Sequence, residues 1–77
     1  SFLNLKLKIY NKSNLVEIKK RMKEIQSIEN IYVQEFNKDY MNLRIKYLGN
    51  LNKLIKELKK VNINLQLIND QWIIKTF

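Results

Sequence analysis

The sequence predicts a small α+β domain in which two helices cover one face of an antiparallel sheet. A chain of 77 residues is long enough for a single core only. Several of its segments alternate apolar and polar residues, as half-buried strands do, and two others repeat apolar residues every three or four positions, as surface helices do. Residues 1–77 are therefore expected to form one domain. Because the chain starts at a serine, we also expect it to be a segment of a longer protein.

The first strand is expected over residues 2–10, with Leu3, Leu5, Leu7 and Ile9 on one side and Phe2, Asn4, Lys6, Lys8 and Tyr10 on the other. A helix should follow, because Ser13 can cap its first turn and Leu15, Ile18, Met22 and Ile25 share one face. This helix should end near Ser27. On its polar side Glu17 and Arg21 have the i,i+4 spacing of an ion pair.

Two strands at residues 31–36 and 40–47 are predicted to form a hairpin, because Asn37, Lys38 and Asp39 favour a turn. Ile28 would still belong to the helix turn before them. Continuous alternation in the strand over residues 31–36 would place Ile31 and Val33 inward and Tyr32, Gln34 and Phe36 outward. Glu35 would then point inward, which a carboxylate tolerates only at the sheet rim or beside a bulge.

The second helix is expected to follow Gly49, with Asn50 as its cap and an apolar stripe formed by Leu51, Leu54, Ile55, Leu58 and Val61. Alternation resumes over residues 62–67, and Asn69 and Asp70 favour a turn before residues 71–77. The chain therefore ends either in one strand or in a hairpin of two. The resulting order, β-α-β-β-α-β with a further strand left open, is the split βαβ or ferredoxin-like arrangement. Its core should contain Leu5, Leu7, Ile18, Met22, Leu43, Ile45, Leu54, Leu58 and Leu65.

The composition argues against catalysis. The chain has no His and no Cys, which removes the usual metal ligands, the commonest general base and the most nucleophilic side chain. Its seven carboxylates are scattered, and a single glycine excludes glycine-rich phosphate loops. No apolar run reaches the length of a membrane span. We therefore expect no enzymatic activity, metal, cofactor or transmembrane segment.

The net charge of +8 favours contact with polyanions, since basic surfaces attract them over long range. Thirteen of the fifteen basic residues are Lys, however, and Asn and Ile are also abundant while Ala and Pro are missing. An AT-rich genome imposes the same bias whatever the function. The charge alone therefore leaves both explanations open.

The candidate binding surface is the sheet face that the helices leave open, which would carry Phe2, Lys6, Lys8, Tyr10, Tyr32, Phe36, Tyr40, Asn42, Arg44 and Lys46. Aromatic rings among basic groups suit base stacking with phosphate neutralisation, and RNA-recognition motifs share this topology. Residues 38–45 depart from their glycine and aromatic pattern, because Asp39, Met41 and Asn42 occupy the characteristic positions. The alternatives are a solvated face, in which tyrosines cover lysine stems, and a face packed on a neighbouring domain or subunit.

The first helix leading into Ile28, Ile31 and Val33, and the strand ending in Tyr47, Leu48 and Gly49 before the second helix, resemble small domains of uncharacterised bacterial cell-envelope proteins. That resemblance implies an accessory or assembly role in the periplasm or envelope. We thus expect an interaction module that binds a protein partner, a neighbouring domain or itself. Single-stranded RNA or DNA binding by the open face is the alternative. Trp72 is a further candidate, as a clamp on the core or as an exposed anchor for a partner.

Overall fold

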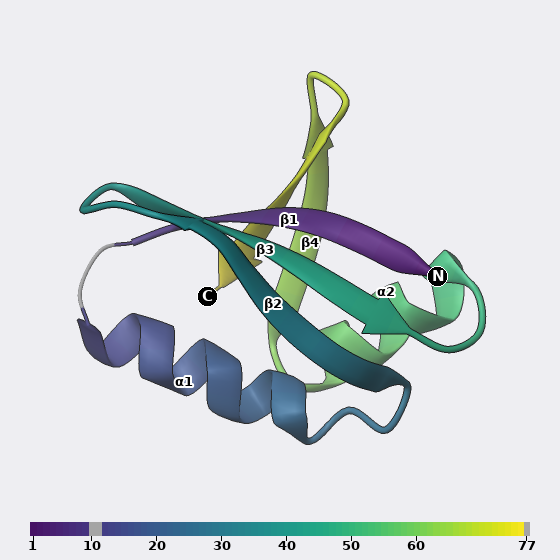
Figure 1. Ribbon diagram of the computed structural model, residues 1–77. Helices are drawn as coiled ribbons and strands as arrows, with labels where there is room; N and C mark the ends of the chain where they lie inside the picture. Colours follow the sequence, from purple (N-terminus) through teal and green to yellow (C-terminus); the bar gives the residue numbers. More distant parts are fainter. Residues whose placement is uncertain (10–11, 77) are drawn as a thin grey trace.

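The computed structural model describes residues 1–9 and 12–76 and shows one layer of helices against one sheet (Figure 1). The elements follow the order β1 (Phe2–Lys8), α1 (Lys12–Lys23), β2 (Ile28–Phe36), β3 (Tyr40–Tyr47), α2 (Leu51–Lys60), β4 (Ile63–Ile68) and β5 (Gln71–Thr76). The predicted α+β class and element order are thus confirmed, with the additional C-terminal strand present as β5.

The five strands form one mixed sheet in the order β2-β3-β1-β5-β4. The pairs β2·β3, β1·β3 and β4·β5 are antiparallel, as expected, but β5 runs parallel to β1 and separates it from β4. In the simple β-α-β-β-α-β arrangement the strand after the second helix would itself lie beside β1. Here the two-residue turn at Asn69 and Asp70, both with positive φ, folds the last strand back into that place.

The core lies between the sheet and both helices. Leu3, Leu5 and Leu7 of β1 are paired with Ile45, Leu43 and Met41 of β3, and these six side chains are buried against Ile18, Met22, Leu54 and Leu58 of the helices. Eight of the nine predicted core residues are buried, and the ninth, Leu65, is half-buried. The alternation in β1 and β3 and the three- and four-residue spacing in the helices therefore predicted the correct inward faces.

Several element boundaries differ from the expectation, and three of them lie around α1. Helix α1 begins at Lys12, one residue before the predicted cap Ser13, and ends at Lys23 instead of near Ser27. The amide N–H groups of Glu24 and Ile25 bond three residues back, to Arg21 and Met22, which tightens and ends the helix. Ile28 consequently belongs to β2, where it is opposite Tyr47.

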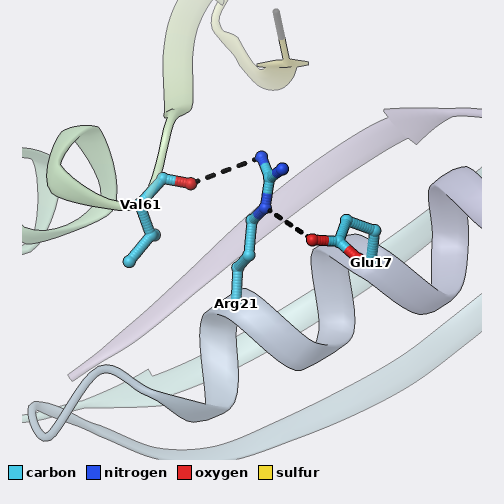
Figure 2. A network of polar contacts seen from close by, with 3 residues as sticks. All are labelled: Glu17, Arg21 and Val61. Atoms are coloured by element: carbon cyan, nitrogen blue, oxygen red, sulfur yellow. Dashed lines mark hydrogen bonds and ion pairs between the residues drawn. The ribbon is translucent and has the colours of Figure 1, made fainter.

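Arg21 connects the two helices (Figure 2). Its Nε lies 3.1 Å from Oε1 of Glu17, which confirms the predicted i,i+4 pair, and its Nη1 donates to the carbonyl oxygen of Val61 at 3.4 Å. Val61 is the C-cap residue of α2, whose last carbonyl groups have no partner inside the helix. The guanidinium thus supplies a donor to the end of α2 from the side of α1.

The α2 cap and the turn between β2 and β3 form at the residues predicted from the sequence. The side chain of Asn50 accepts a hydrogen bond from the Lys53 amide at 2.8 Å, which confirms Asn50 as the cap of α2. Gly49 before it has a φ of +85°, a conformation that side chains disfavour. The turn between β2 and β3 is held by Asn37, whose Oδ1 accepts from the amides of Asp39 and Tyr40.

Candidate functional site

The open face of the sheet brings most of the predicted surface residues together. In the register of β1 and β3, Phe2 is opposite Lys46, Lys6 is opposite Asn42 and Lys8 is opposite Tyr40. Residues opposite one another share a face, and these alternate with the buried leucines, so all of them point away from the helices. Tyr32 of β2 joins them opposite Arg44, whereas Tyr10 lies outside the described residues.

Two cations on this face lie over aromatic rings. Nζ of Lys6 is 4.3 Å from the ring centroid of Tyr40, and Cζ of Arg44 is 4.2 Å from that of Phe2. Both distances are within the range of a cation–π contact, which fixes the position of the cation and covers one side of the ring. Nε of Arg44 is buried and has no hydrogen-bond partner. The face thus presents positioned cations beside aromatic rings.

A bulge in β2 changes the expected face of two residues. The register shifts between Val33 and Glu35, so Glu35 is opposite Asn42 on the open face and Phe36 is opposite Met41 on the helix side. Two hydrogen bonds hold the Glu35 carboxylate there, from Tyr40 Oη at 3.1 Å and from Asn42 Nδ2 at 3.2 Å. The expectation that Phe36 points to the open face is therefore wrong, and the bulge that Glu35 required is present.

Two shallow hollows cross the open face. One of about 240 Å³ extends from β2 to β5, and its lining contains four amide residues from four strands, Asn4, Gln34, Asn42 and Gln71, together with Leu5, Asp70 and Trp72. The other, about 300 Å³, is lined by Lys6, Lys8, Asp39, Tyr40 and Ile73. Donors and acceptors of amides therefore lie next to positioned cations, an arrangement that can contact a polar or anionic ligand from several strands at once.

Trp72 lies on the opposite side of the sheet. It is paired with Leu5 of β1 and with Leu67 of β4, and it packs against the core as a half-buried side chain. Of the two alternatives for Trp72, this position corresponds to a clamp on the core and not to an exposed anchor. Leu67, beside it, remains 53% exposed near the tip of the β4–β5 hairpin, which rises away from the helices (Figure 1).

The edge strand β4 is a surface that the sequence did not single out. Its six residues, Ile63–Ile68, carry no charge in a chain of net charge +8, and within residues 1–9 and 12–76 no strand pairs with its outer side. Leu67 and Ile68 are exposed. The alternation predicted the strand itself, but its place at the edge depends on the strand order, for which the sequence carries no local signal.

Among residues 1–9 and 12–76, no group of three or more carboxylates gathers in a way that could bind a metal ion. Within the same ranges no helix has the length and apolar character needed to cross a bilayer. The chain matches no known family model, and neither a curated protein nor a solved structure shows significant similarity to it.

Proposed function

We propose that this domain is a non-catalytic interaction or assembly module that binds a protein through the exposed edge of β4. One observation supports the proposal above all: an uncharged, six-residue edge strand with exposed Leu67 and Ile68 in an otherwise basic molecule. Unpaired backbone N–H and C=O groups of such an edge can pair with an incoming strand, while exposed apolar side chains add contact area.

The resemblance to domains of bacterial envelope proteins supports an accessory role of this kind in the periplasm or envelope. A signal peptide upstream of Ser1 in the parent gene would agree with that location. A cytosolic nucleic-acid enzyme upstream of Ser1 would count against it.

Site-specific photo-cross-linking in the cells that produce the protein tests the edge. A photoreactive residue at Gln66, exposed on β4, should form protein adducts, whereas one at Lys56, exposed on α2, should form few. Both positions are solvent-accessible, so the pair controls for random collision. Equal yields at the two positions would refute the assignment of β4 as the binding edge.

The open face supports a second candidate function, binding of single-stranded RNA or DNA. Its specific support is the pair of stacked contacts, Lys6 on Tyr40 and Arg44 on Phe2, beside the amide-lined hollow. Lysines and arginines can neutralise phosphates, and aromatic and guanidinium planes can stack with unpaired bases.

A salt titration with fluorescent oligonucleotides tests this alternative, because phosphate contacts make affinity fall steeply as salt rises. Lys6→Glu with Arg44→Glu should leave the fold intact and abolish binding, since both side chains point away from the helices. Lys56→Glu with Lys59→Glu makes the same change of charge on exposed positions of α2 and should retain most of the affinity. Absence of binding by the native chain at low salt would eliminate this function.

A further inference from the structure

The two edge strands of the sheet, β2 and β4, differ in the features that allow or hinder pairing with another strand. At the β2 edge the pairing with β3 is interrupted twice, between Ile28 and Asn30 and between Val33 and Glu35. Bulges of this kind twist an edge and hinder further pairing. At the β4 edge the pairing with β5 is regular from Ile63 to Ile68, with no bulge and no charged side chain. Only β4 combines a regular backbone with neutral side chains.

The first five residues of β4, positions 63–67, form a pattern that is symmetric about Leu65. On the helix side Leu65 lies between Ile63 and Leu67, and on the open side Asn64 and Gln66 flank it. If a second β4 runs antiparallel with Leu65 opposite Leu65, then Ile63 is opposite Leu67 and Asn64 is opposite Gln66. Within residues 63–67 each apolar side chain then meets an apolar one and each amide meets an amide, as favourable cross-strand pairs require, whereas Ile68 falls opposite Asn62 just before the strand.

The two ends of β4 differ in exposure, and the same antiparallel pairing would place the exposed end of one copy against the buried end of the other. Ile63, at the start of the strand, is fully buried, whereas Leu67, near the tip of the hairpin, is 53% exposed. Antiparallel pairing about Leu65 places the exposed end of each strand against the covered end of the other. The tip of the β4–β5 hairpin rises away from both helices (Figure 1), whereas the start of β4 packs beside α2.

From these observations we infer that the protein bound at β4 is a second copy of this chain. The two β4 strands pair antiparallel about a twofold axis at Leu65, and two five-stranded sheets become one continuous sheet. This inference rests on the proposed function, since it names the partner of the same edge.

Charge makes the expected salt dependence distinctive. Each chain carries +8, so two copies repel one another, but β4 itself adds no charge to the contact. Added salt screens the repulsion and should strengthen the dimer, which is the opposite of its effect on phosphate binding. A six-residue edge contact is smaller than a standard interface, so we expect a weak dimer with a Kd between about 10 μM and 1 mM.

Disulfide trapping tests the register, and the chain has no cysteine of its own to interfere. Asn64→Cys and Gln66→Cys, both on exposed positions, are prepared as separate chains and then oxidised singly or as an equimolar mixture. In the proposed register position 64 of one copy is directly opposite position 66 of the other, within the span of a disulfide. In two identical variants the cysteines are diagonal neighbours whose Cα atoms lie about 7–8 Å apart, beyond the usual disulfide span. The mixture should therefore give mostly the mixed disulfide dimer.

Sedimentation velocity of the native chain at two salt concentrations supplies the second measurement. We expect a monomer–dimer equilibrium that salt strengthens. Asn64→Lys with Gln66→Lys, which places like charges opposite one another, should keep the chain monomeric. Circular dichroism should show that this exposed pair leaves the fold intact. A monomer at about 1 mM native chain, or trapping of identical variants in preference to the mixture, would overturn the inference.

The cross-linking experiment at Gln66 distinguishes failure of the dimer inference from failure of the proposal that β4 binds a protein. Adducts of twice the mass of the chain support the dimer. Adducts with a different protein would retain the interaction module and reject self-association, and equal yields at Gln66 and Lys56 would reject both.

Discussion

Replacing Leu54 by Ala should remove a large part of the stability of the domain. Leu54 lies on α2 with none of its side chain exposed, within the core beneath the sheet. At about 0.8 kcal/mol for each buried methylene, the carbon atoms lost by Leu→Ala correspond to about 2.4 kcal/mol, and the cavity left behind raises this to about 3–4 kcal/mol. A domain of this length has a total of about 4–12 kcal/mol.

Urea unfolding followed by circular dichroism gives the free energy directly, and a thermal scan should show the midpoint lowered by about 12–32 °C. Leu48→Ala is the matched control, because Leu48 is 58% exposed in the loop before α2 and the same truncation there should cost less than about 0.5 kcal/mol. Equal losses for the two variants would refute the assignment of the buried face of α2.

Three further predictions concern the ends of elements. Trp72, half-buried against the core, should emit at shorter wavelength than free tryptophan and resist iodide; a red-shifted, freely quenched emission would contradict its packing. Asn50→Ala should lower the free energy of unfolding by about 1 kcal/mol through loss of the α2 cap, whereas Asn52→Ala, at an exposed helical position, should not; equal effects would rule out the capping role. Ser27→Ala removes the 2.9 Å hydrogen bond from buried Oγ to Glu57 and should cost about 1 kcal/mol in the same assay, and an unchanged stability would show that this bond contributes nothing.

The fold was predictable where local signals decide it. The spacing of Ile18 and Met22 identified the inner face of α1, and Asn50 marked the start of α2, because periodicity and capping depend on neighbours in the sequence. The alternation of β3 was equally informative. Its even-numbered residues, which include Asn42 and Arg44, all lie on the open face as expected.

The sequence was less informative where pairing between distant segments decides the structure. The bulge that moves Phe36 to the helix side is visible only once β2 is aligned with β3, although Glu35 at an inward position already indicated an irregularity. In β5 both sets of alternating residues are mixed, so nothing local showed that Trp72 and Ile74 face inward. The strand order that makes β4 an edge depends on the same non-local contacts.

The parallel pairing of β1 with β5 has a consequence for how the chain folds. The first and last strands are neighbours near the middle of the sheet, with Leu5 opposite Trp72, so almost the whole chain separates two residues in register. Pairing of such distant segments is slow, because the intervening loop must be closed before any contact compensates for the lost entropy. During synthesis β1 therefore keeps one side unpaired until the C-terminal hairpin has emerged from the ribosome. A chain that stops after α2 would expose that side permanently and would be prone to aggregate.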